Sequence, residues 1–143
     1  MHEARIESLA NPLVKELRAL RTPKGRDEQR RFLAEGAWML DAAASAGWRP
    51  RLLLVDTSTE GRASMPSAGR ADRIVETTRE VLSKITGREN PQPLLAVFDE
   101  PSDAARQGAA VDWTRASRWL LLERPRDPGN LGGAIRSADA AGA

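Results

Sequence analysis

The segment from residue 127 to residue 143 contains the residue types that hold phosphates and sugar hydroxyls, in the order DPGNLGGAIRSADAAGA. Its Pro-Gly pair predicts a tight turn after a strand, and its Gly-Gly pair lets a ligand or another chain come close to the backbone. Asn130 is placed to cap the following helix or to hold a loop carbonyl. Arg136 projects from that helix within two turns, where its guanidinium can meet a phosphate or a ribose.

Two common phosphate loops are excluded in this segment. No Lys-Ser or Lys-Thr pair follows the glycines, as a Walker loop requires, and the glycine spacing departs from the GxGxxG dinucleotide pattern. A plain structural role for the glycines, in a turn and in helix packing, explains the residue types equally well. Both interpretations stay open on residue types alone.

The composition limits the chemistry that the chain can perform. It has no cysteine, which excludes disulfides and thiolate metal sites. Its one histidine, His2, lies at the amino terminus, which argues against a histidine metal site or a catalytic triad. Tyrosine is absent as well. Any reaction must therefore rely on Arg, Lys, Asp, Glu, Ser, Thr, Asn and backbone groups.

Length and hydropathy indicate a globular chain. Its 143 residues suffice for one ordinary domain, or for a small domain and part of another. A hydrophobic share of 41% with 29% charged residues is typical of a soluble protein with a real core. No apolar run approaches the roughly 20 residues that cross a bilayer, and the charged start MHEARIES is unlike a signal peptide. We therefore expect a cytoplasmic protein.

Basic residues concentrate near the amino terminus. Between residues 15 and 31, seven basic side chains stand against three acidic ones, although the net charge of the chain is only +2. A local positive field is typical of a surface that binds a polyanion, and a solvated basic face is the alternative. The seven candidate residues are Lys15, Arg18, Arg21, Lys24, Arg26, Arg30 and Arg31. The tryptophans are expected in the core or at its boundary rather than as base-stacking platforms: Trp38, Trp48, Trp113 and Trp119.

The first 98 residues alternate helical and strand patterns. Asn11 and Pro12 begin a helix with an apolar stripe, and the following TPKGRDEQRR is expected to be a basic loop. RRFLAEG predicts a short strand that runs into a helix, RLLLV a buried strand, and DTSTEGRASMPSAGRA a surface loop. RIVET predicts a strand, a threonine-capped helix follows it, and NPQPLLAVF ends in a further strand. This order predicts an α/β domain over residues 1–98.

After a linker at residues 99–117, the pattern starts again. RWLLLE is expected to be a buried strand, RPRDPGNLGG a loop, and AIRSADAAGA a helix. Strand, loop and helix are how an α/β domain opens, and no second strand follows in these residues. We therefore expect residues 118–143 to be an incomplete second domain.

The glycine-rich segment resembles the first signature motif of the SpoU/TrmH RNA 2′-O-ribose methyltransferases, which belong to the trefoil-knotted SPOUT superfamily; the matching run is DPGNLGGAIRSADAAG. The family's substrate-binding domain has an α/β/α fold like that of ribosomal protein L30e. Its start is similar to IESLANPLVKELRALRTPKGRDEQRRFLAEG, and its last strand to NPQPLLAVFDEP. The resemblance covers nearly the whole chain. It implies an L30e-like RNA-binding domain followed by the first strand, loop and helix of a SPOUT methyltransferase domain.

The resemblance also implies roles for individual residues. Asn130 and Arg136 match the functional Asn and Arg of the motif, and in the family the Arg is proposed to activate the ribose 2′-hydroxyl for attack on the methyl group of S-adenosylmethionine. Arginine has a pKa above about 12 and is a poor base. We therefore expect Arg136 to orient the hydroxyl or its phosphate and to stabilise oxyanion charge, and Asn130 to fix the loop or the arginine. The seven basic residues become RNA-binding candidates, for ribosomal RNA rather than transfer RNA.

The family's second and third motifs have no counterpart in these residues. In the family those motifs carry the knot, the S-adenosylmethionine pocket and most of the homodimer interface, so we expect no cofactor site and no methyl transfer from the 143 residues alone. Two functions stay open: the RNA-binding front part of a homodimeric methyltransferase, or a stand-alone L30e-like RNA-binding module. A nucleotide-binding protein unrelated to RNA would need a phosphate loop that the sequence lacks.

Overall fold

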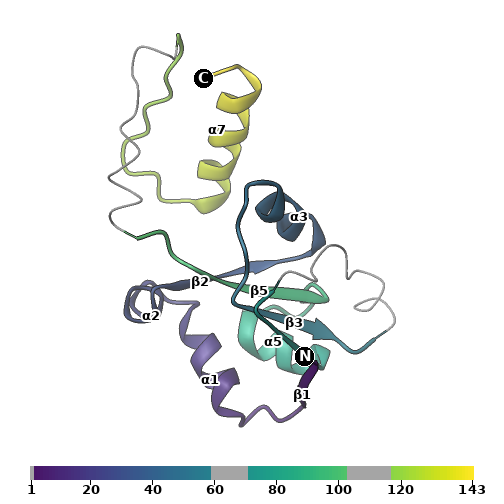
Figure 1. The fold of residues 1–143 in the computed structure, drawn as a ribbon. Coiled ribbons are helices and arrows are strands. Elements are labelled where there is room, and N and C mark those ends of the chain that lie inside the picture. Colours follow the sequence, from purple (N-terminus) through teal and green to yellow (C-terminus); the bar gives the residue numbers. More distant parts are fainter. Residues whose placement is uncertain (1, 59–70, 103–116) are drawn as a thin grey trace. The chain divides into compact units, whose positions relative to one another are not determined.

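The computed structural model describes residues 2–58, 71–102 and 117–143 (Figure 1). The chain divides into two compact units, Met1–Pro101 and Ser102–Ala143. Most of the surface loop expected after RLLLV, most of the linker expected at residues 99–117, and Trp113 lie outside the described residues. No helix within the described ranges is long and apolar enough to span a membrane.

A mixed five-stranded sheet with the order β1-β4-β3-β5-β2 forms the centre of the first unit. β1, β4 and β3 pair in parallel, whereas β5 runs antiparallel to both β3 and β2. The predicted α/β class is confirmed, and β2 to β5 form in the four runs that predict strands. The bounds are β1 (His2–Ile6), β2 (Arg31–Glu35), β3 (Leu52–Asp56), β4 (Arg73–Thr77) and β5 (Leu94–Asp99).

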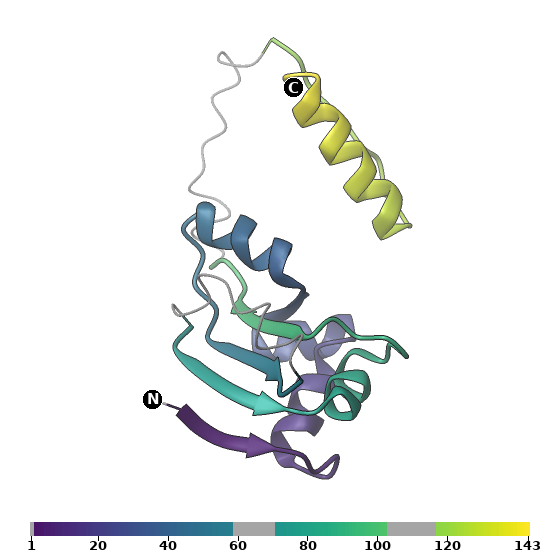
Figure 2. The same cartoon turned by 90° about the vertical axis from the view of Figure 1, so that its right-hand side faces the viewer.

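Helices cover both faces of this sheet. Helices α1 (Pro12–Ala19) and α5 (Arg79–Thr86) lie on one face, and α3 (Ala37–Ser45) lies on the other (Figures 1 and 2). Successive side chains of a strand point to opposite faces. Leu54 of β3 therefore packs with Val14 and Val81 under α1 and α5, while the next residue, Val55, packs with Leu40 of α3. The central strand is buried on both sides, and the unit has a core in each layer.

Side-chain caps explain where α1 and α5 begin. The side chain of Asn11 accepts a hydrogen bond from the Leu13 N–H at 2.9 Å, and Pro12 occupies the first turn, where its missing N–H costs nothing. Thr78 Oγ1 accepts from the Val81 N–H at 3.4 Å, and Gly87, with φ +72°, ends α5 in the left-handed conformation. The predicted starts of both helices are confirmed.

The expectation of a basic loop at TPKGRDEQRR is wrong, because most of this run forms helix α2 (Pro23–Gln29). Thr22 Oγ1 caps it by accepting the Gly25 N–H at 3.1 Å, and Pro23 starts the helix rather than breaking one. Gly25 is needed for packing, since a Cβ there would lie 2.0 Å from the carbonyl oxygen of Ala19. The proline and the glycine thus join two helices closely.

Strand β1 is not predicted from the sequence. It pairs in parallel with β4, with His2 opposite Ile74 and Ile6 opposite Thr77. The Thr77 hydroxyl, which is buried, donates a hydrogen bond to the Ile6 carbonyl at 2.7 Å. The run HEARI carries too many charged residues to predict a strand by itself, so its conformation depends on the neighbouring strand.

In the second unit, the expected strand RWLLLE is also wrong. Residues 118–123 have no regular secondary structure, and helix α7 (Pro128–Ala140) follows them. Trp119 is 50% exposed and Leu121 94%. A strand needs a neighbour for its backbone N–H and C=O groups, and the described residues of this unit offer none.

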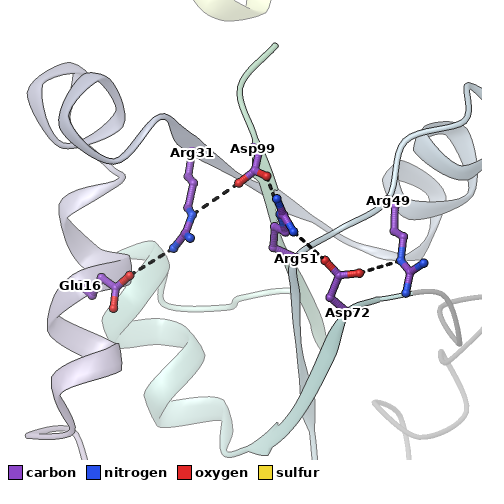
Figure 3. Close-up of polar contacts among 6 residues, drawn as sticks. All are labelled: Glu16, Arg31, Arg49, Arg51, Asp72 and Asp99. Atoms are coloured by element: carbon purple, nitrogen blue, oxygen red, sulfur yellow. Dashed lines mark hydrogen bonds and ion pairs between the residues drawn. The ribbon is translucent and has the colours of Figure 1, made fainter. Parts of the chain in front are cut away.

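Six charged side chains form an alternating chain of ion pairs at the edge of the sheet where β5 ends (Figure 3). Arg31 lies between Glu16 of α1 and Asp99, with contacts of 3.4 and 3.5 Å. Hydrogen bonds to Asp99 and then to Asp72 raise the pKa of Arg51 above its ordinary value. These arginines are therefore neutralised within the unit. The order along the chain is Glu16, Arg31, Asp99, Arg51, Asp72 and Arg49.

Candidate nucleic-acid interface

The glycine-rich helix α7 begins six residues earlier than the sequence predicts. Asp127 is its N-cap and accepts the Asn130 N–H at 2.7 Å, and Pro128 occupies the first helical position. Asn130 is thus inside the first turn, and the predictions of a tight turn at Pro128 and of a cap at Asn130 are wrong. The Asp-Pro start outweighs the low helix propensity of the glycines.

Arg136 is exposed and lies in the third turn of α7. Its guanidinium folds back toward the start of the helix, as long helical side chains do. A Cβ at Gly132 would lie 3.4 Å from Arg136 Nη1, whereas nothing lies within 4 Å of a Cβ at Gly133. The guanidinium therefore lies near Gly132, at a distance that an alanine Cβ would still tolerate. Asn130 lies about 120° away around the helix axis, and no hydrogen bond joins the two within residues 117–143.

A groove of about 480 Å³ runs beside α7, but Asn130 and Arg136 are not among its lining residues. Its walls are mainly apolar, from Trp119, Leu120, Leu122 and Ile135, and Arg118 and Asp139 are its charged members. The described ranges also contain no cluster of acidic or histidine side chains suited to a metal ion.

Four of the seven basic candidates make contacts within the chain. Arg26 Nη1 donates to the Leu20 carbonyl at 3.1 Å. Arg30, with φ +53° at the end of α2, lies 3.6 Å from Glu100, and Arg31 belongs to the ion-pair chain. Lys24 faces Glu28 one turn away, at 3.7 Å. A structural role thus accounts for Arg26, Arg30 and Arg31, and their contact with RNA stays a prediction.

Arg18 and Arg21 lie in a groove that sequence reasoning missed. The groove has a volume of about 570 Å³ and runs between α1 and α5, which pack together. Helix α5 and the residues after it contribute Arg79, Lys84 and Arg88 to the lining. The signal was present in REVLSKITGR, whose apolar residues alternate with basic ones at helical spacing. Only the packing of α5 against α1 brings these charges beside the predicted ones.

Two arginine side chains, Arg21 and Arg88, contact other residues at the border of this groove. The Arg21 guanidinium lies over Gly87, where a Cβ would approach it to 2.3 Å. Arg88 Nε lies 3.1 Å from Glu35 Oε1, whose carboxylate is mostly buried. Arg21 and Arg88 also line a second groove of about 460 Å³ on the side of β2. The two arginines therefore form the divide between two adjoining hollows.

The tryptophans only partly follow their prediction. Trp48 packs at the core boundary, with ring centres 6.0 Å from Phe32 and 6.2 Å from Phe98. Trp38 is 74% exposed, which contradicts a core position. Neither lines the α1–α5 groove.

Comparison with known proteins relates both units to RNA methyltransferases. A protein of Bacillus subtilis (strain 168) named 23S rRNA (guanosine(2553)-2′-O)-methyltransferase RlmP is 31% identical over 137 residues, which are 96% of this chain and 51% of that protein. Among solved structures, one described as an RNA 2′-O ribose methyltransferase matches 97% of this chain and 53% of its own, with a TM-score of 0.73 and 37% identity. The SpoU methyltransferase AviRb from Streptomyces viridochromogenes matches 93% of this chain and 49% of its own, with a TM-score of 0.67 and 28% identity.

These matches define the class first: an α/β unit followed by a glycine-rich helix, shared with SpoU methyltransferases. The model of the MRM3-like substrate binding domain matches residues 11–96, and the chain belongs to that family. The resemblance to SpoU/TrmH enzymes is thereby confirmed. The chain spans about half the length of the curated relatives that it matches.

Proposed function

We propose that this chain is the RNA-binding portion, with the first catalytic segment, of an S-adenosylmethionine-dependent RNA 2′-O-ribose methyltransferase that acts on ribosomal RNA. The observation that carries the proposal is the match of 96% of the chain to half of an enzyme named for that reaction. In this proposal residues 1–98 bind the RNA, residues 99–117 link, and residues 118–143 begin the catalytic domain. A homodimer and a cytoplasmic location are further parts of the proposal.

Arg136 acts in this proposal on the ribose rather than as a base. S-adenosylmethionine supplies the methyl group. In this proposal the cofactor is bound by parts of the enzyme outside the described residues. Because arginine is a poor base, the Arg136 guanidinium orients the 2′-hydroxyl or the neighbouring phosphate and stabilises charge that develops on the oxygen. Arg136 is exposed, as a side chain that contacts the RNA must be.

The test is methyl transfer by the whole protein that contains this chain. We would incubate it with unmodified ribosomal RNA and labelled S-adenosylmethionine, then map label by resistance of the RNA linkage to alkali, which requires a blocked 2′-oxygen. Arg136→Ala is expected to abolish transfer, and the exposed Arg5→Ala is the control. Label on a base instead of the ribose would contradict the proposal.

A stand-alone RNA-binding module is the second candidate. The first unit has two core layers and a basic groove of its own. Calorimetric titration of the 143-residue chain with S-adenosylmethionine and with RNA is informative here. We expect heat with RNA and none with the cofactor, and binding of the cofactor would show that our location of its pocket is wrong.

A further inference from the structure

The cations of the first unit fall into two groups. Arg26, Arg30 and Arg31 are held by acceptors within the chain. Arg18 and Lys84 are exposed, as is Arg21, and no ion pair holds any of these three among the described residues. A carboxylate offsets the charge of Arg30 and of Arg31, whereas the neutral Leu20 carbonyl only holds the Arg26 side chain in place. Arg18, Arg21 and Lys84 keep their full charge, and they lie on α1, just after it and on α5.

The available charge lines one groove rather than a convex face. The α1–α5 groove contains five basic side chains and two acidic ones, Glu80 and Glu89. Hydrogen bonds from its own backbone N–H and from the Thr78 side chain lower the pKa of Glu80, so this carboxylate stays ionised and the five cations outnumber the two acidic groups by three. A groove lined by cations raises the local concentration of an anion more than scattered surface charge does.

The two helices present these charges from a fixed base. Val14 and Leu17 of α1 share one core cluster with Val81, Leu82 and Ile85 of α5. All five side chains are at most 1% exposed. The spacing of the charges across the groove is therefore set by the core, and little ordering is needed when a ligand binds.

The lining also indicates how the ligand is contacted. Among the described residues, no aromatic side chain borders this groove. Proteins that hold single-stranded RNA stack its bases on aromatic rings, whereas duplex RNA is recognised through its shape and its phosphates. Cations without aromatic platforms suit the second mode.

We propose that the α1–α5 groove binds backbone phosphates of structured RNA, with Arg18, Arg21 and Lys84 as the phosphate contacts. This inference rests on the proposed function and states which surface of the first unit carries it. The Arg21 guanidinium lies over Gly87, and Arg88, which is paired with Glu35, is a positioning residue between the two grooves. The basic run at residues 24–31 is not the main contact.

The experiment measures binding of the 143-residue chain to a fluorescein-labelled RNA stem–loop by fluorescence anisotropy, over a range of salt concentrations. The groove variant carries Arg18→Gln, Arg21→Gln and Lys84→Gln. The matched control loses the same charge elsewhere on the unit, through Arg5→Gln, Arg49→Gln and Arg73→Gln, none of which lines the groove. A third variant, Arg18→Lys with Arg21→Lys, keeps the charge in the groove. Urea unfolding of each variant confirms that the sheet is intact.

We expect the groove variant to bind about tenfold or more weakly, with the slope of log affinity against log salt smaller by about three, one for each lost phosphate contact. The control is expected to change neither quantity much, and the lysine variant to retain most binding. An equal loss of RNA affinity in the groove variant and in the control would overturn the inference. It would also be overturned if the wild-type chain bound an unstructured strand of equal length more tightly than the stem–loop. If the wild-type chain binds no RNA at all, the proposed RNA-binding function of the first unit fails. If the wild type binds RNA and the groove variant loses no more affinity than the control, only the assignment of the groove fails.

Discussion

The first unit and the described part of the second treat similar apolar runs in opposite ways. RLLLV becomes β3, whose Leu53 and Leu54 are at most 1% exposed, whereas WLLL in the second unit leaves Leu121 94% exposed. Helix α7 has no buried residue, although Ile135 lies on it. The runs are alike in composition, so the difference comes from their neighbours. β3 lies between β4 and β5, and residues 118–123 pair with no strand in the described structure.

This comparison predicts the largest contrast for leucines. Leu54→Ala removes a side chain from the closed core and is expected to lower the free energy of unfolding by about 2–5 kcal/mol. Leu121→Ala is expected to change it by less than about 0.5 kcal/mol. Urea unfolding followed by circular dichroism measures both. A similar loss in the two variants would mean that Leu121 is packed in solution.

Glycines sharpen the same contrast at a smaller scale. Gly25→Ala forces a Cβ against the Ala19 carbonyl and is expected to cost about 1–3 kcal/mol of unfolding free energy. Gly133→Ala meets nothing within 4 Å, and it is expected to stabilise α7 by about 0.5–1 kcal/mol because alanine favours helix. Urea midpoints test the first variant and helical circular dichroism the second. A stabilising Gly25→Ala or a destabilising Gly133→Ala would contradict the packing described for the respective helix.

Helix caps give a third pair. Thr78→Ala removes the cap of α5 and is expected to cost the first unit about 1 kcal/mol. Asp127→Ala removes the cap of α7 and is expected to lower helix content without moving the unfolding midpoint of the sheet. Circular dichroism at two wavelengths, combined with urea unfolding, separates the effects. A shift of the sheet midpoint with Asp127→Ala would show that the units unfold together.

The smallest effect is expected from acid. The pKa of Glu80 is lowered by hydrogen bonds from its own backbone N–H and from Thr78, so its ionised form favours the folded state. Its contribution is present above the usual glutamate pKa of about 4.3 and is lost as pH falls through the lower folded-state value. The difference in unfolding free energy between wild type and Glu80→Gln is therefore expected to be smaller in acid than at neutral pH. A gap that widens in acid would contradict this assignment.

Local patterns predicted much of the first unit, because its signals lie within a few residues. Asn11-Pro12 and Thr78 fix helix starts by hydrogen bonds to the next turn, and the α/β class follows from the order of runs. The Thr22-Pro23 start of α2 carries the same signal, but the glycine and the basic residues that follow it fit a loop equally well, so the run by itself does not predict a helix. Strand β1 and the missing strand at residues 118–123 depend on long-range pairing, which a local pattern does not contain.

The candidate site shows the same limit. Arg18 and Arg21 were predicted from the local charge, and the structure places both in the α1–α5 groove. Lys84 and Arg88 were missed because they are more than sixty positions away in the chain and join the groove only through packing. Arg26 and Arg31 have the same charge, but their acceptors, Leu20 and Asp99, were unknown before the fold. RNA contact by any of these residues, and the roles of Asn130 and Arg136, stay predictions.

The placement of β5 has a mechanical consequence. This strand lies between β2 and β3, antiparallel to both, and the first unit ends at Pro101, two residues after it. Tension on the chain at Pro101 pulls β5 along its own axis. The hydrogen bonds that join β5 to β2 and to β3 are then loaded in shear, and the ion pairs of Asp99 strengthen the end of β5 that bears the load. Optical tweezers attached at the carboxyl ends of β2 and β5 should record one high-force rupture. Attachment at Arg31 and Pro101, adjacent points that peel the β2–β5 ladder open, should need much less force.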